Sequence, residues 1–152
     1  MAEYLLLDDF IDFQLVGVNS SFESSFQFIY HLNQQFETRF QRINDLDILI
    51  NQQEFFFSTF YWYDVFNKID YHIIKNRPTE SISKNKGVNL SQLFPADFPL
   101  VSEYDECNYI LKITGWDEDV TDLKLPFKTT NFIDKLKIYD IEDIRDADRL
   151  IF

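Results

Sequence analysis

Two histidines and one cysteine are the side chains of this chain best suited to acid–base or nucleophilic catalysis. His31 and His72 have no second histidine, cysteine or carboxylate at the spacing of metal-binding motifs such as H-x-x-x-H. Cys107 could act as a nucleophile only if the fold brought a histidine beside it. The sequence therefore predicts no catalytic, cofactor-binding or metal-binding residue, and a protein that is not an enzyme.

An acidic run at 117–119, followed by Asp122, has the residue types of a calcium-binding loop but not its pattern. Counting from Asp117, the sixth position of such a loop requires glycine and is Asp122. The twelfth position requires glutamate and is Lys128. The run is more typical of a helix start, where carboxylates favour the helix dipole. With only three glycines, none clustered, the sequence also lacks a phosphate-cradling loop.

Aromatic residues are the more informative feature, because they make up 18% of the chain and occupy both faces of one predicted strand, Glu54–Asp64. One face of a half-exposed sheet should be polar. One hypothesis is that this strand is central and covered on both faces within the monomer. The other is that a protein partner or a second copy of the chain buries one face. Tyrosine and tryptophan are enriched at interface hot spots, so the predicted partner interface is Tyr61, Trp62 and Tyr63.

Alternating and helical periodicities divide the rest of the chain into strands and two helices. A capping-box spacing from Ser20 to Glu23 accompanies an amphipathic helix over Phe22–Glu37. A second, acidic helix is expected to begin within 116–120 and to stop or bend at Pro126. Strands are expected over Asp12–Val18, Phe40–Ile50, Glu54–Asp64, Ile69–Ile74, Tyr109–Thr114 and Phe132–Ile141.

This order of elements predicts an α+β fold, with an antiparallel sheet of about five strands and two helices packed on one face. We expect one globular domain over residues 1–152, with a loop at 76–92. The closing Leu150–Phe152 is too apolar for a free tail, and we expect it to be docked on the domain.

Composition and charge narrow the function classes. The 152 residues carry a net charge of −12, which works against direct binding to nucleic acid or to anionic membranes. A single cysteine cannot form an internal disulfide, which suits a reducing cytoplasm. No apolar run reaches the roughly 20 residues of a membrane span, and the first residues lack the basic region of a signal peptide. We therefore predict a cytoplasmic protein with no membrane, nucleic-acid or metal partner.

The segment Leu100–Ile113 runs from an acidic, turn-like stretch into an alternating strand, and this pattern resembles the IPExxVDY family of small bacterial proteins. Ser102 stands where the family has its name-giving proline, and Cys107-Asn108 where it has a hydrophobic-Asp pair. The resemblance implies a bacterial cytoplasmic protein of the Bacteroidota type with no assigned function, and it supplies no catalytic residue. Further stretches that resemble the family are Asp12–Val18, Leu32-Asn33, Tyr61, Tyr63, Ile73–Asn76 and Leu150–Phe152.

These observations favour a non-catalytic adaptor or regulator that acts through contacts with a protein partner or as a homodimer. Two alternatives stay open. The chain could be an acidic factor that docks on a basic surface of a nucleic-acid machine, steered by its net charge. It could also be a small-molecule sensor with a pocket assembled from distant residues, which a sequence does not reveal.

Overall fold

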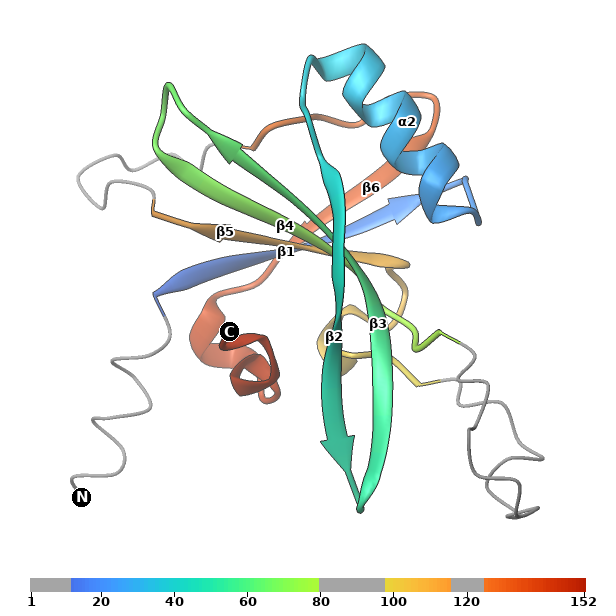
Figure 1. Ribbon diagram of the computed structural model, residues 1–152, viewed down its shortest axis with the longest axis vertical. Helices are drawn as coiled ribbons and strands as arrows, with labels where there is room; N and C mark the ends of the chain where they lie inside the picture. The colour runs from blue at the N-terminus through green and yellow to red at the C-terminus, as the bar shows by residue number, and fades with distance from the viewer. Residues whose placement is uncertain (1–11, 80–97, 116–124) are drawn as a thin grey trace.

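The computed structural model describes residues 12–79, 98–115 and 125–152. Its main feature is a six-stranded, fully antiparallel sheet with the strand order β2-β3-β4-β5-β1-β6 (Figure 1). One α-helix lies in these residues, α2 (Ser25–Phe36). The strands are β1 (Phe13–Ser20), β2 (Gln41–Ile50), β3 (Gln53–Asp64), β4 (Ile69–Lys75), β5 (Tyr109–Thr114) and β6 (Ile133–Ile138).

Two separate hydrophobic clusters cover the two faces of the sheet. The helix α2 packs on one face through Phe28, Ile29 and Leu32. The other face is covered by the segment around the short helix η2 (Ser102–Tyr104) and by the C-terminal turns. Figure 1 shows α2 and the C-terminal turns well apart, with the strands between them. Strands buried on both faces read as nearly continuous apolar runs, as β5 does.

The segment that carries the family resemblance is a cap held against β4 and β1. The Asn76 side chain is fully buried; its amide donates to the carbonyls of Tyr104 and Cys107, and its oxygen accepts from the Val101 amide. The hydroxyl of Tyr104 donates to the Leu15 carbonyl. A Cβ on Gly17 would lie 2.4 Å from the Tyr104 ring, so this close approach of the cap to β1 requires glycine.

The structure confirms the α+β fold and the antiparallel sheet, and it corrects the count of elements. The sheet has six strands instead of about five. In the residues that are described, one α-helix packs on one face and the C-terminal turns pack on the other, so the expected pair of helices on one face is wrong for this part of the chain. The predicted acidic helix falls largely on 116–124, outside the described residues, as does 80–92 of the predicted loop.

The predicted capping box is also wrong. The helix begins at Ser25, and the hydroxyl of Ser24 accepts from the Gln27 amide. Ser20 is the last residue of β1, and its hydroxyl donates to the Phe132 carbonyl at 2.8 Å. The Ser20 hydroxyl, which the local spacing predicted to cap the helix, therefore bonds instead to a residue 112 positions away in the chain.

The ends of the chain and of β6 differ in part from expectation. β6 stops at Ile138, and Ile141–Asp143 forms the short helix η3 instead of continuing the strand. The expected docking of the closing residues is confirmed for Leu150, which is fully buried at the end of η4 (Ala147–Leu150). Phe152 is 54% exposed, and its ring nevertheless contacts the sheet through His72 and Lys112.

Candidate functional site

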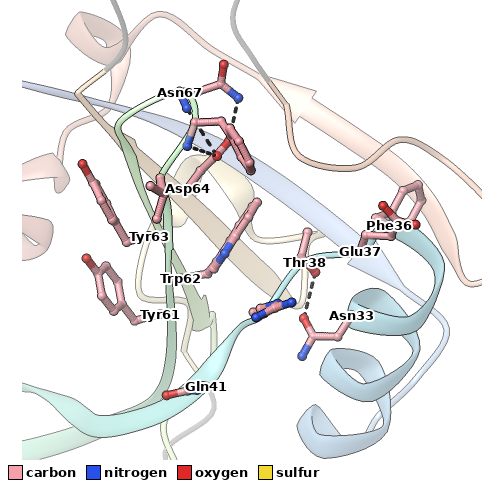
Figure 2. Close-up of a pocket in the computed structure, with 13 residues that line it drawn as sticks. Asn33, Phe36, Glu37, Thr38, Gln41, Tyr61, Trp62, Tyr63, Asp64 and Asn67 are labelled. Carbon is pink, nitrogen blue, oxygen red and sulfur yellow. Dashed lines mark hydrogen bonds between the residues drawn. The ribbon is translucent and has the colours of Figure 1, made fainter.

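The three predicted interface residues lie at the end of β3 and do not share a face. Trp62 points toward α2, where its ring stacks on Tyr71 with centroids 5.3 Å apart. Tyr61 and Tyr63 point to the opposite side of β3, as Figure 2 shows. Strand alternation requires this split. Tyr63 is the most exposed of the three at 42%, and Tyr61 and Trp62 are half-buried.

Both aromatic faces of β3 are covered within the monomer in the middle of the strand and become accessible at its end. Phe57 and Phe60, on opposite faces, are 0% and 2% exposed. The hypothesis of a strand covered on both sides therefore describes the middle of β3. Beyond Phe60 the strand leads into a turn with Val65 70% and Phe66 97% exposed. The most exposed aromatic side chains in and beside β3, Tyr63 and Phe66, lie at this end.

A groove of about 990 Å³ lies at this end, between the end of α2 and the end of β3 (Figure 2). All three predicted interface residues line it. It is broad and open, and its surface combines apolar rings with polar atoms. The other lining residues are Asn33, Phe36, Glu37, Thr38, Arg39, Gln41, Asp64, Val65, Phe66 and Asn67.

Asn33 fixes the first wall of the groove. Its side-chain oxygen accepts from the Phe40 amide at 3.0 Å and from the Thr38 hydroxyl at 2.8 Å, and its nitrogen donates to the Phe40 carbonyl. Glu37, with a φ of 56°, ends the helix in the left-handed conformation that reverses the chain. The Leu32-Asn33 pair thus buries one side chain in the core and uses the next to join α2 to β2.

Asp64 fixes the second wall. Its carboxylate accepts from the backbone amides of Phe66 and Asn67 and from the Asn67 side chain, as Figure 2 shows in part. These bonds close the turn that joins β3 to β4. Both walls are therefore held by hydrogen bonds inside the protein, and the groove is a formed feature of the fold.

The groove also contains a free edge of β3. The strand β2 begins at Gln41, which pairs with Tyr61. Beyond that point Trp62, Tyr63 and Asp64 pair with β4 on one side and, among the described strands, with nothing on the other. An unpaired edge offers backbone N–H and C=O groups to another extended chain.

A second candidate site, which the sequence reasoning missed, surrounds Lys112 on the opposite face from α2. Lys112 is 3% exposed, and its register partner in β4 is His72. The Lys112 Nζ lies 3.6 Å from the centre of the Phe152 ring and 4.7 Å from that of Phe13. The next pair on the same face of the sheet is Asp70 with Thr114.

Burial determines the electrostatics of this second site, the Lys112 cluster. It lowers the pKa of Lys112 from 10.5 to about 8, against the opposing effect of Asp12 and Asp70. Burial, together with the charge of Lys112, lowers the pKa of His72 to about 4. The Tyr61 hydroxyl donates to the Asp70 carboxylate, and this bond with burial raises the pKa of Tyr61 to about 12.

The structure does not assemble the residues that the sequence considered for catalysis. His31 stacks on Phe22 at the surface of α2, and His72 lies on the other face of the sheet between Tyr61 and Phe152. Cys107 is 2% exposed, and burial raises the pKa of its thiol, which disfavours the reactive thiolate. In residues 12–79, 98–115 and 125–152, no three His, Cys, Asp or Glu side chains group closely enough to hold a metal ion.

Comparisons with known proteins gave no match in a scan against protein-family profiles, in a search of curated proteins or in a search of solved structures. The resemblance to the IPExxVDY family therefore stays a prediction. No helix in the described part of the chain has the length and apolar character that crossing a membrane requires.

Proposed function

We propose that the groove at the end of β3 binds an extended segment of a partner protein, and that the chain acts as a non-catalytic adaptor or regulator. The observation that supports this most is the edge at Trp62–Asp64, unpaired among the described strands, which lines a groove whose walls are hydrogen-bonded within the protein. Peptides that add a strand to such an edge gain affinity from main-chain hydrogen bonds. They gain specificity from pockets for alternate side chains.

The aromatic lining suits such a partner. Trp62 faces the α2 side of the edge and Tyr63 the other, so an added strand would meet an aromatic ring on each of its faces. The exposed Val65 and Phe66 extend the apolar surface past the end of the strand. Large aromatic side chains at the centre of an interface contribute most of its binding energy in typical complexes.

Charge favours a basic partner segment. The chain carries a net charge of −12, and such a field attracts cationic partners and speeds their association at low ionic strength. Glu37 and Asp64 line the groove together with Arg39. We therefore expect a segment with lysine or arginine flanking one or two apolar residues. The same preference would apply to a basic surface of a larger assembly.

Selection from a library of displayed 12-residue peptides, followed by affinity measurement with purified protein, tests this proposal. Peptides selected on the wild type should lose most of their affinity for Tyr63→Ser. They should keep it for Tyr30→Ser, which removes a 60% exposed tyrosine from α2, outside the groove. Equal affinity for the two variants would contradict the proposal. If sedimentation showed a dimer that Tyr63→Ser abolishes, the groove would bind a second copy of the chain instead of a segment of another protein.

A further inference from the structure

Lys112 occupies an unusual position for a lysine. It lies in β5, between β4 and β1, and five of the six residues of β5 are buried. Its side chain is buried in the face of the sheet that the C-terminal turns cover, where its Nζ lies between the rings of Phe13 and Phe152. A buried ammonium is costly unless it is paired and hydrogen-bonded. The structure therefore places a strongly basic group where burial penalises its charged form and the two ring faces offset only part of that cost.

Hydrogen bonds do not compensate for this burial. In the described part of the chain, the Lys112 Nζ makes no hydrogen bond or ion pair, and its contacts are with the faces of the Phe13 and Phe152 rings. Nearby, the Nδ1 atom of His72 and the hydroxyl of Thr114 are buried without a hydrogen-bond partner in the protein. Two polar groups on the same face as Lys112, one on β4 and one on β5, are thus left with unused bonding capacity.

The charged groups that face Lys112 do not remove this capacity. Asp70, on β4, is engaged by the Tyr61 hydroxyl. Asp12 and Asp70 both favour the charged form of Lys112, and burial outweighs them. His72 disfavours the charged form when it is itself protonated, and its pKa near 4 keeps it neutral at pH 7. His72 is thus neutral and Asp70 is engaged, which leaves Asp12 as the remaining charge that acts on the amine.

We propose that the Lys112 Nζ is a nucleophilic amine that condenses reversibly with a small aldehyde or ketone. The nitrogen lone pair attacks the carbonyl carbon and forms a C–N bond. The carbonyl oxygen then takes up the two protons that the amine gives up and leaves as one molecule of water, so that a C=N bond remains. No oxidant or reductant is needed. The unpartnered His72 Nδ1 and Thr114 hydroxyl lie on the same face of the sheet as Lys112, and we assign them to hold the water or the oxygen of the carbonyl compound.

The protonation state supports this chemistry. With a pKa of about 8, roughly a tenth of Lys112 is neutral at pH 7. This fraction is on the order of a hundred times that of an ordinary lysine. Lysines with lowered pKa in apolar surroundings are those that form imines with carbonyl substrates.

Phe152 controls access to the amine. Its ring lies over the Nζ and is 54% exposed, whereas Phe13 is 2% exposed and fixed in the core. We therefore expect removal of this ring in Phe152→Ala to increase the access of solvent to the amine. The aromatic surroundings favour a small apolar or aromatic carbonyl compound over a highly charged one.

Reductive trapping tests the proposal. The full-length protein at pH 7 is treated with limiting benzaldehyde and cyanoborohydride, and the modification rate of each lysine is followed by peptide mass spectrometry. The exposed Lys128 serves as the internal reference. Lys112 should be modified several-fold faster than Lys128 in the wild type, and faster still in Phe152→Ala. Lys112→Arg should remove the fast phase and leave the rate at Lys128 unchanged.

The Phe152→Ala protein decides the outcome. Amide hydrogen exchange of β5 first establishes that the sheet of this variant is intact. A Lys112 rate above that of Lys128 in the folded variant supports the proposal. A Lys112 rate equal to or below that of Lys128 would overturn the proposal. Lys112 would then have only a structural role, through its contacts with the two rings. The result is independent of the groove, which lies at the end of β3 and does not include Lys112.

Discussion

The groove and the Lys112 cluster are built on neighbouring strands, and they differ in how far the hydrogen-bonding capacity of their polar side chains is satisfied within the protein. In the groove, the side chains of Asn33 and Asp64 are fully used by the protein itself, and the aromatic rings are exposed. In the Lys112 cluster, the His72 Nδ1 and the Thr114 hydroxyl are buried without partners among the described residues, and two rings lie over the Lys112 Nζ. The first arrangement suits association with another chain. The second accepts a cost in stability, which is typical of functional positions.

The largest effect should come from removing the charge of the Lys112 cluster. Lys112→Met keeps the length of the side chain and removes a buried ammonium without a hydrogen bond, so we expect the free energy of unfolding at pH 7 to rise by about 2 kcal/mol. Urea denaturation measures this change. The control Lys128→Met, at an exposed position, should stay within about 0.5 kcal/mol. A loss of stability in Lys112→Met would show that the ammonium is stabilising where it lies.

A pH dependence should accompany that effect. The folded-state pKa of Lys112, about 8, lies below its ordinary 10.5, so the unfolded chain binds more protons between these values. The wild type should therefore gain stability relative to Lys112→Met as the pH rises from about 8 to 10.5, and show no difference in slope below that window. Denaturation curves of both proteins across this range provide the test. Parallel curves would contradict the lowered pKa.

His72 should produce a similar effect in the acid range. Its pKa is lowered from 6.5 to about 4, so stability that is present above pH 6.5 should be lost as the pH falls toward 4. Relative to His72→Phe, we expect the wild type to lose about 1–2 kcal/mol across this window. The matched variant His31→Phe, changed at an exposed position on α2, is measured under the same conditions as the control. If the wild type and His72→Phe lost stability equally as the pH falls, the pKa of His72 would not be lowered by burial, and this prediction would be wrong.

The hydrogen bonds of the groove wall should contribute a smaller amount. Asn33→Ala leaves the Phe40 amide and carbonyl without their side-chain partner, and we expect a loss of about 1–2 kcal/mol in the free energy of unfolding. Binding of a selected peptide should also weaken because the wall is no longer fixed. Gln35→Ala, on the same helix and outside the groove lining, is the control. If Asn33→Ala bound the peptide with the affinity of the wild type, the hydrogen bonds of this wall would not contribute to peptide binding.

Tyr63→Ser should have the smallest effect on stability, although we expect it to weaken peptide binding most. Tyr63→Ser alters an exposed side chain and should change the free energy of unfolding by less than about 0.5 kcal/mol. Thermal denaturation checks this value alongside the peptide affinities. A large destabilisation would mean that the Tyr63 ring supports the fold, and loss of binding in this variant could then not be attributed to the groove.

Local patterns predicted the strands because alternation is a local property. β5 has the predicted bounds, and the other strands differ at their ends, by up to three residues for β6. The capping assignment failed because Ser20 bonds to Phe132, a partner that no local pattern identifies. Alternation also implies that Trp62 and its two neighbouring tyrosines lie on opposite faces. The groove that includes all three depends on where β2 begins beside β3.

Lys112 could not be recognised for a related reason. One lysine inside Tyr109–Thr114 is compatible with a strand that turns one face to solvent. Only the strand order, which places β5 between β4 and β1, and the return of Phe152 over this face bury it. The one available signal was the apolar character of its neighbours Leu111 and Ile113, which is typical of a strand buried on both faces.

The most direct test of the account is amide hydrogen exchange at Trp62–Asp64, with and without a saturating peptide selected for binding. If the peptide adds a strand to β3, at least one of these amides should exchange more slowly in the complex, while exchange in β5 stays unchanged. Protection that appears elsewhere on the protein, with none at Trp62–Asp64, would contradict the claim that this edge is the binding site.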